Sequence, residues 1–398
     1  MNGSAMLLSV GLLFLAATVG QAVDDEFNKP INILDDDGTK VGQLPAERDP
    51  LPFDGNRGDA RLGVTRAGHV YVAMGDALCW TEDDGNSWQS RNLPVGAGGF
   101  GVLRDDTFIV FGGYPQCWVI RSTDYGQTWE EKIPLDLSPF TSGGGGWTQI
   151  SQPPGCPALM VVTLRHGNGT QDADGNPLPP EKLGIHDYIY RSTDSGKTWG
   201  DKRLIVRDSA ESSVLLLKSG KMLAAIRKQR EPQRVLPGED AAKLKAMGAW
   251  QDGKPFIKHG FLAESDDKGY TWHSERMGPV SRVTKCGLCP SELVQLPDER
   301  VVWIYTRKFA DDADDPRASL GEGQGIYARI SADEGATWSA HRYLLRLLKR
   351  PGYTPYPAST VLPDGTILTL TGTNRPQTVG ENPAMAIRWR PEPIAQVE

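Results

Sequence analysis

An eight-residue pattern, Ser/Thr-x-Asp-x-Gly-x-Ser/Thr-Trp, recurs along the chain and constrains its fold more than any other feature. The copies are Thr81–Trp88, Ser122–Trp129, Ser192–Trp199, Ser265–Trp272 and Ser331–Trp338. In each copy the Asp can accept hydrogen bonds from backbone N–H groups ahead of it, and the Gly supplies a positive φ. A short apolar run precedes every copy and its Trp begins the next strand, so each one predicts a β-hairpin turn whose Trp packs beneath it.

A second kind of turn precedes each repeat and is followed by an apolar run, as in "RDDTFIVFGG", "KSGKMLAAIR" and "PDGTILTLTGT". There are six of these turns and five repeats. Each unit is therefore predicted to contain four strands, A to D, with this second kind of turn joining A to B and the repeat joining C to D. Six such units in a row predict an all-β fold, a six-bladed β-propeller of four-stranded antiparallel blades. We expect the propeller over residues 50–393, after a lead-in at 23–49 and before a tail at 394–398.

The strand order predicts which face of this propeller carries the function. Consecutive strands alternate in direction, so the C–D repeats lie on the same face as the A–B turns. The long insertions fall in the B–C and D–A connections, at His166–Asp187, Lys228–His259, Lys308–Gln324 and after Arg342. Because binding residues concentrate on loops held by a rigid scaffold, we expect the site on the face away from the repeats.

The N-terminus and the composition narrow the setting. Met6–Gly20 is an apolar run, and small residues follow at Gly20-Gln21-Ala22, so residues 1–22 predict a secretory signal peptide and a secreted or periplasmic protein. The run is too short for a comfortable membrane span, and we expect none in the mature chain. The net charge of −7 argues against nucleic acid as a partner. We expect a monomer.

The five cysteines, Cys79, Cys117, Cys156, Cys286 and Cys289, leave at least one unpaired if the others form disulfides. Cys286 and Cys289 have CxxC spacing, but no second pair or His pair accompanies them, so a local disulfide or two plain thiols are the better interpretations. The six His show no ligand spacing. No metal and no cofactor are expected.

Polar residues gather where the predicted A strands begin. Tyr356 and Glu211 each lie nine residues before the Gly of their A–B turn, and Asp59 has the same spacing in the first unit. The B strands of the fourth and fifth units end at Arg227 and Arg307. The first B strand is followed by Asp76. These side chains are predicted to share the mouth of the propeller.

At these residues the chain resembles the sialidase (neuraminidase) superfamily. The five repeats match its Asp-box, also called the BNR repeat, and "YPASTVLPDGTILTL" resembles the segment that carries the family's Tyr nucleophile. "ESSVLLLKSGKMLAAIR" resembles its Glu-plus-Arg segment. The resemblance implies Tyr356 as nucleophile, Glu211 as its partner, and Arg227 and Arg307 as binders of the substrate carboxylate.

Two parts of the family pattern differ here. The family has an Arg-Ile-Pro segment in blade one, whereas this chain has "GNRGDARLGVTRAG", in which Arg57 and Arg61 are the candidates for a third Arg. The family's general-acid Asp lies in a longer loop after the first B strand. Here almost no loop is left, so Asp76 and Asp59 are the candidates. Trp147, near the start of the third A strand, could stack against a sugar or pack in the core.

The residues and the resemblance together predict an exported exo-glycosidase acting on sialic acid or a related acidic sugar of a glycoconjugate. A neutral Tyr, deprotonated by Glu as it attacks, avoids the repulsion that a carboxylate nucleophile would meet at an anomeric carbon bearing a carboxylate. Arginines would bind that carboxylate through charge-assisted bonds. Two alternatives stay open, namely a non-catalytic propeller that binds glycan or protein and a glycosidase for another glycan.

Overall fold

The computed structural model describes the chain from 29 to 392 with gaps. The described ranges are 29–35, 38–51, 60–144, 148–166, 171–172, 174–179, 184–230, 250–251, 254–255, 257–277, 288–307, 325–347, 356–371 and 384–392. Only the backbone is described at 228–230, 250–251, 254–255, 257–259, 274–277, 288–290 and 307. Every regular element within these ranges is a strand, which confirms the all-β expectation.

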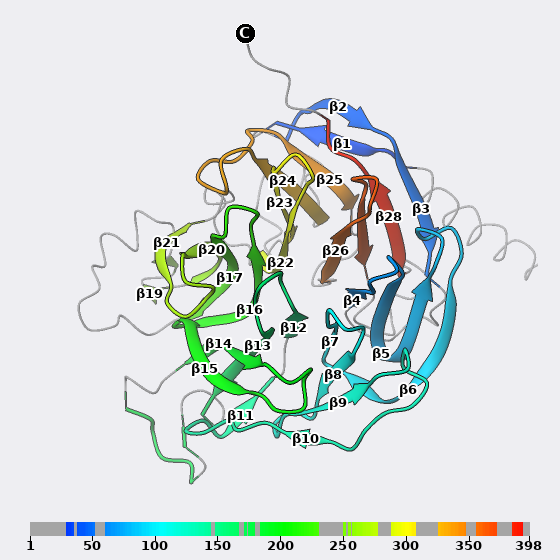
Figure 1. Cartoon of the computed structure of the whole chain (residues 1–398). Coiled ribbons are helices and arrows are strands. Elements are labelled where there is room, and N and C mark those ends of the chain that lie inside the picture. Colours follow the sequence, from blue (N-terminus) through cyan, green and yellow to red (C-terminus); the bar gives the residue numbers. More distant parts are fainter. Residues whose placement is uncertain are drawn as a thin grey trace, which may run out of the picture.

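Six strands form the innermost layer and lie around a common centre (Figure 1). They are β4 (Arg61–Val64), β7 (Gly99–Val102), β12 (Thr148–Ser151), β16 (Ser209–Leu216), β22 (Leu288–Gln295) and β26 (Pro357–Val361). Each contacts the next in this order, and β26 contacts β4. The inner strands therefore follow one another around a central axis.

Antiparallel partners extend each inner strand outward. The second strands are β5 (Val70–Thr81), β8 (Phe108–Gly112), β13 (Ala158–Arg165), β17 (Met222–Arg230), β23 (Val301–Arg307) and β27 (Ile367–Thr371). The third strands are β9 (Trp118–Ser122), β14 (Ile185–Ser192), β20 (Ile257–Ser265), β24 (Gly325–Ser331) and β28 (Met385–Trp389). The outer strands are β6 (Gln89–Ala97), β10 (Ile133–Pro134), β15 (Gly200–Val206), β21 (His273–Met277), β25 (Arg342–Leu347) and β3 (Ala46–Pro50). Two short pairings lie apart from this pattern, β11 (Ser142–Gly143) on β13 and β18 (Trp250–Gln251) on β19 (Lys254–Pro255).

The first sheet has no separate third strand because β5 contains a reversal. In a straight strand Tyr71 and Trp80 would lie about 30 Å apart, at about 3.3 Å per residue. Their rings instead stack with centroids 5.9 Å apart. Gly75 has φ 58°, and the pairing of β5 with β6 shifts between Gly75 and Ala77. The chain therefore turns back at Gly75–Asp76, and β5 supplies both the second and the third strand.

The repeated octapeptides form the turns that the sequence predicts. In the second copy, Asp124 accepts the backbone N–H of Thr128 at 2.9 Å and its hydroxyl at 2.6 Å. Gly126 has φ 77° and donates its N–H to Ser122 Oγ at 2.8 Å. The hydrogen bond from the Thr128 hydroxyl makes the largest contribution to lowering the pKa of Asp124 to about 2. The residue before the Gly is also left-handed, since Tyr125 has φ 58°.

The repeats and the A–B turns share one face, as the strand order predicts. Tyr125, in the second repeat, donates its hydroxyl to Asp106 in the A–B turn of the same unit at 3.5 Å. Lys221, in the fourth A–B turn, is ion-paired with Glu334 of the fifth repeat at 3.3 Å. Ser195 of the third repeat donates to Asp105. These contacts place the opposite ends of the strands, where Tyr356 lies, on the other face.

The lead-in at 23–49, to which the sequence assigned no strand, contributes to two sheets. Strands β1 (Ile31–Leu34) and β2 (Lys40–Leu44) extend the fifth sheet beyond β25, and β3 pairs with β28 as the outer strand of the sixth. Arg388 of β28 joins these segments to the first unit. It is ion-paired with Glu47 at 3.0 Å and with Asp49 at 2.8 Å, and it donates to the carbonyl of Asp84 at 3.1 Å.

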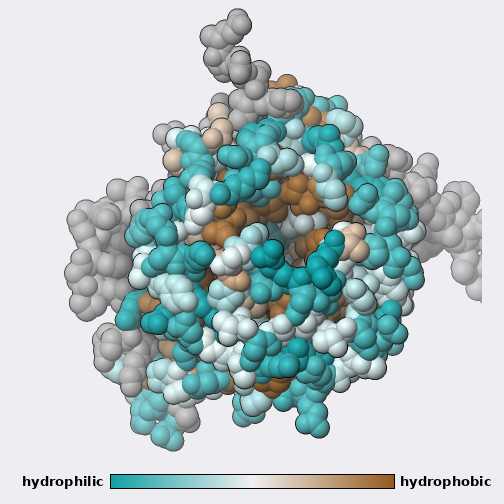
Figure 2. All heavy atoms as spheres, viewed as in Figure 1, coloured by the Kyte–Doolittle hydropathy of each residue, from teal (hydrophilic) through white to brown (hydrophobic). Residues whose placement is uncertain are grey.

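The apolar core lies between neighbouring sheets. One cluster joins Leu159 and Ile189 of the third sheet to Met222 and Ile226 of the fourth, all nearly inaccessible to solvent. Figure 2 shows that the middle of the face toward the viewer is hollowed and that hydrophobic side chains border the hollow. The core therefore surrounds the axis and leaves the inner strands lining it.

Candidate functional site

Tyr356 and Glu211, which come from the sixth and fourth units, meet directly. The Tyr356 hydroxyl donates to Glu211 Oε1 at 2.8 Å. The other carboxylate oxygen of Glu211, Oε2, forms an ion pair with Arg227 Nη1 at 2.7 Å. The side chain of Glu211 is 5% exposed and that of Arg227 is 11% exposed. A phenol, a carboxylate and a guanidinium thus form a connected and largely desolvated chain.

A β-bulge places Glu211 at this point. Ala210 pairs with Arg227 and Ser213 with Ala225, so Glu211 and Ser212 together oppose the single residue Ile226. Glu211 has φ 59°, a left-handed conformation that is sterically costly for a residue with a Cβ. Bulges and left-handed residues recur at functional sites because they redirect a side chain that a regular strand would point elsewhere.

Arg61, whose spacing did not fit the family pattern cleanly, lies beside Tyr356. Its guanidinium carbon is 5.9 Å from the centroid of the Tyr356 ring, and Nη1 donates to the carbonyl of Ala60 at 2.7 Å. Arg61 is 5% exposed and opens β4. Of the two Arg candidates in the first unit, it is the one that the described residues bring to the Tyr.

Asp76 lies at the tip of the reversal in β5 and is exposed. Arg61 pairs with Ala73, three residues before Asp76, so the tip belongs to the same end of the first sheet as Tyr356. The Arg307 backbone pairs with Leu288 and Gly325 at the end of β23. Its side chain, and all of Arg57, Asp59 and Trp147, lie outside the described residues.

Glu292 belongs to the surroundings of the site and was not predicted. It is in β22, accepts the backbone N–H of Ser359 at 2.8 Å and is 8% exposed. Burial raises the pKa of its carboxyl to about 8, against the lowering effects of the Ser359 N–H and of Arg61. A Glu just before the apolar pair Leu293–Val294 in a predicted inner strand was the available signal, since an ionisable residue there is rarely buried without a role.

An exposed aromatic residue on the same face was also missed. Tyr114 follows β8 and is 54% exposed, and the guanidinium carbon of Arg165 lies 4.9 Å from its ring centroid. Arg165 ends β13, so both residues belong to the strand ends opposite the repeats. A Tyr two residues after the second B strand was the signal in the sequence.

Two cavities follow the inner strands. One of about 180 Å³ is lined by Arg61, Phe100, Gln149, Glu292 and Ala358 among others. The other, of about 390 Å³, shares Gln149 and Glu292 with it and continues along β16 and β26. The cavity next to Arg61 near the axis is therefore lined in part by the polar side chains of Gln149 and Glu292.

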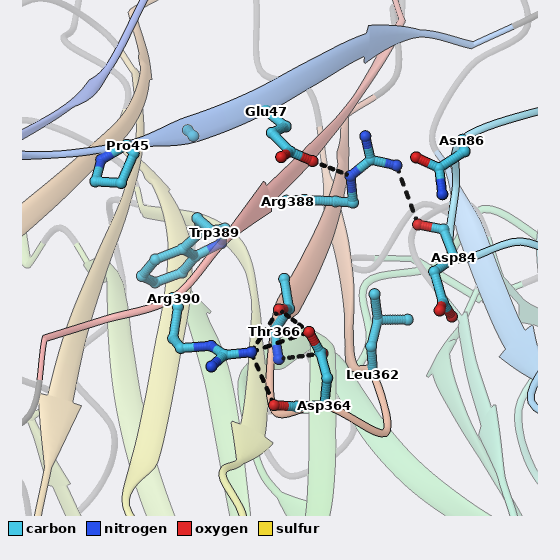
Figure 3. Close-up of a pocket in the computed structure, with 11 residues that line it drawn as sticks. Pro45, Glu47, Asp84, Asn86, Leu362, Asp364, Thr366, Arg388, Trp389 and Arg390 are labelled. Carbon is cyan, nitrogen blue, oxygen red and sulfur yellow. Dashed lines mark hydrogen bonds and ion pairs between the residues drawn. The ribbon is translucent and has the colours of Figure 1, made fainter.

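A separate cavity of about 390 Å³ lies on the repeat face, between the sixth and first units (Figure 3). Arg388 points from its wall toward Glu47 and Asp84, and Arg390 is held by Asp364 and Thr366. None of the predicted site residues lines it. Of these two arginines, Arg388 joins the sixth sheet to the first unit, whereas the contacts of Arg390 lie within the sixth unit.

Three of the cysteines, Cys79, Cys117 and Cys156, are buried free thiols. Burial raises the pKa of Cys117 to about 12. Within the described ranges, no group of three or more His, Cys, Asp or Glu side chains could hold a metal ion. Among the same residues, no helix has the length and apolar character needed to cross a membrane.

No family model matches the chain, and no curated protein matches it by sequence. Solved structures do resemble it. A protein of unknown function from Dyadobacter fermentans is 16% identical with a TM-score of 0.56, covering 90% of this chain and 98% of its own. A Hadza microbial sialidase is 17% identical with a TM-score of 0.54, covering 88% of this chain and 70% of its own.

An alpha-L-arabinofuranosidase from Fusarium graminearum, solved with an iminosugar inhibitor, is 12% identical with a TM-score of 0.52, covering 88% of this chain and 98% of its own. The chain is thus structurally similar to sialidases of the Asp-box propeller fold and to this arabinofuranosidase. At these identities the likeness establishes a fold that glycoside hydrolases share.

Proposed function

We propose that the protein is a retaining exo-glycosidase of sialidase type that removes a terminal acidic sugar from glycoconjugates. The observation that carries the proposal is the 2.8 Å hydrogen bond from the Tyr356 hydroxyl to Glu211, next to Arg227. A nucleophile within hydrogen-bond reach of a base that a third group orients is the arrangement of covalent catalysis.

In the proposed reaction Tyr356 Oη attacks the anomeric carbon, and Glu211 takes the phenolic proton. The bond from the anomeric carbon to the leaving oxygen breaks as the Tyr–sugar bond forms, and an acid protonates that oxygen. We assign the acid to Asp76, which is exposed at the tip beside β4. Asp76, left as a carboxylate by the first step, then takes a proton from a water whose oxygen displaces Tyr356 from the anomeric carbon, and Glu211 returns its proton to the phenolate, so two inversions give retention.

The charges around the pair support an acidic substrate. Arg227 is ion-paired with Glu211, and the Arg61 guanidinium lies beside the Tyr356 ring. A carboxylate on the substrate would gain charge-assisted hydrogen bonds there. The uncharged Tyr nucleophile would meet no repulsion from that carboxylate.

The test is hydrolysis of a panel of fluorogenic glycosides by the purified protein, comparing a sialoside with neutral hexosides and an α-L-arabinofuranoside. We expect release from the sialoside, lost in Tyr356→Phe and reduced at least about 100-fold in Glu211→Gln, since a general base contributes about 10²–10⁴-fold. A 2,3-difluorinated sialic acid should also leave a covalent adduct on Tyr356. Unchanged turnover by Tyr356→Phe would refute the assignment.

A neutral substrate is the second candidate, because one structural neighbour is an arabinofuranosidase. Cleavage of the arabinofuranoside alone would favour it and would assign Arg61 and Arg227 to orienting Tyr356 and Glu211. Saturable glycan binding without turnover would instead indicate a binding protein.

The same proposal includes the architecture and the location of the protein. We propose that the six sheets form a closed six-bladed propeller, supported by the successive contacts of the inner strands and by β26 against β4. We also propose export after removal of residues 1–22. Intact mass of the protein recovered from its host should correspond to a chain that begins near residue 23.

A further inference from the structure

Asp187 is a fully buried carboxylate that has no part in the proposed reaction. It lies in β14 with 0% of its surface exposed. Thr163 donates its hydroxyl to Oδ1 at 2.6 Å. Ser212 donates its backbone N–H to Oδ2 at 3.0 Å and its hydroxyl to the same oxygen. Burying a carboxylate is costly unless hydrogen bonds compensate it, and three donors do so here. Such a buried and satisfied polar network fixes the geometry of the groups that take part in it.

These hydrogen bonds converge on the backbone of Glu211. The Glu211 N–H donates to Thr163 Oγ1 at 3.3 Å, and the next N–H along the chain, that of Ser212, is the one bound by Asp187. A bulge sets two residues against one and disturbs the ladder hydrogen bonds there. In this bulge, side chains of β13 and β14 bind the N–H groups on both sides of the Glu211 Cα.

The segment before the bulge is anchored in the same way. The backbone N–H of Asp187 donates to Ser209 Oγ at 2.9 Å, and Ser209 Oγ donates to the carbonyl of Val206 at 2.6 Å. The backbone N–H of Asp208 donates to His186 Nδ1 at 3.0 Å. The third sheet therefore fixes the chain from Asp208 to Ser212, in which both Asp208, with φ 53°, and Glu211, with φ 59°, are left-handed.

We propose that Thr163 and Asp187 are positioning residues that hold Glu211 in its left-handed conformation and thereby aim its carboxylate at the Tyr356 hydroxyl. Thr163 and Asp187 bind the backbone N–H groups of Glu211 and Ser212, so they act through the backbone of Glu211. Without them the bulge can relax toward the extended region, which moves the carboxylate away from the phenol. The catalytic consequence rests on the proposed function, whereas the geometric consequence does not.

The test compares Thr163→Val, which keeps the shape and removes the hydroxyl, with Thr163→Ser, which keeps the hydroxyl. On the substrate that wild type cleaves, we expect kcat of Thr163→Val to fall about 100-fold with KM changed less than about threefold, because a misplacement of about 1 Å can cost that much. Thr163→Ser should restore kcat to within about threefold of wild type. Asp187→Asn, which keeps the volume, should lower kcat in the same direction.

Crystal structures of the same variants give a readout that needs no activity. In Thr163→Val we expect residue 211 to leave the left-handed region and the Tyr356 Oη–Glu211 Oε1 distance to exceed 3.5 Å. An unchanged left-handed φ and an unchanged short contact would overturn the proposal, as would an unchanged kcat in a wild type that is active. If wild type cleaves no substrate, the proposed function fails and these structures alone decide the positioning role. If Thr163→Val does not fold, Asp187→Asn decides it by the same distance and dihedral angle.

Discussion

The left-handed backbone of Glu211 predicts an inverted order of stability for two substitutions. Glu211→Gly and Glu211→Ala both remove the carboxylate, so the loss of the Tyr356 bond and of the Arg227 ion pair cancels when the two are compared. Elsewhere in a strand, Gly is less stable than Ala by about 0.5–1 kcal/mol because it loses more conformational freedom. At φ 59° the Cβ costs about 1–2 kcal/mol, which only Gly avoids.

Subtracting the central values of the two effects, about 1.5 and about 0.75 kcal/mol, leaves Glu211→Gly more stable than Glu211→Ala by about 0.75 kcal/mol. The assay is equilibrium urea denaturation of both variants, with the free energy of unfolding compared at equal m-values. Ser213 provides the matched control, because it is buried in the same strand, just past the bulge, and has no positive φ. Ser213→Ala should be more stable than Ser213→Gly. If Glu211→Ala equals or exceeds Glu211→Gly while Ser213 behaves as stated, the backbone at Glu211 is not strained and the reasoning is refuted.

Burial raises the pKa of Glu292 to about 8 in the folded state, against about 4.3 in the unfolded state. Between these two values the folded state binds one more proton than the unfolded state, so the free energy of unfolding falls as the pH rises. Urea denaturation should therefore show Glu292→Gln losing less stability than wild type from about pH 5 to about pH 8. Tyr114→Ala should raise KM for an oligosaccharide more than for a small aryl glycoside, whereas Tyr270→Ala, equally an exposed Tyr but within a repeat on the opposite face, should change neither. Arg388→Met should lower the free energy of unfolding by about 1 kcal/mol, and a double-mutant cycle with Asp49→Asn should show coupling; additive effects would mean that the ion pair does not stabilise the junction.

The periodic part of the architecture was readable because each repeat is a local structure. The hydrogen bonds of Asp124 reach residues at most four positions away, so the turn forms from its own sequence. The reversal at Gly75–Asp76 was readable for the same reason. The pairing of β3 with β28 was not, because the partners Pro50 and Met385 are far apart in the chain and neither strand carries a repeat.

Part of the site was predictable through the strand register. Counting back from the A–B turns led to Tyr356 and Glu211, and the structure joins them at 2.8 Å. The spacing in the first unit was ambiguous between Arg57 and Arg61, and only the tertiary contact brings Arg61 to the Tyr356 ring. Glu292 was missed because its neighbours in sequence are ordinary strand residues, and its raised pKa comes from burial among other strands.

The sequence by itself determined the class of structure, the face that carries the repeats and the residues that differ between units. It could do so because turns and alternating strands depend on residues close together in the chain. The tertiary structure decided what those differing residues do to one another. The conformation of Glu211 depends on Thr163 and Asp187 of another sheet, and its carboxylate lies between Arg227 and a Tyr at position 356. Such contacts form only when the sheets pack around the axis, since no local hydrogen bond holds these side chains together.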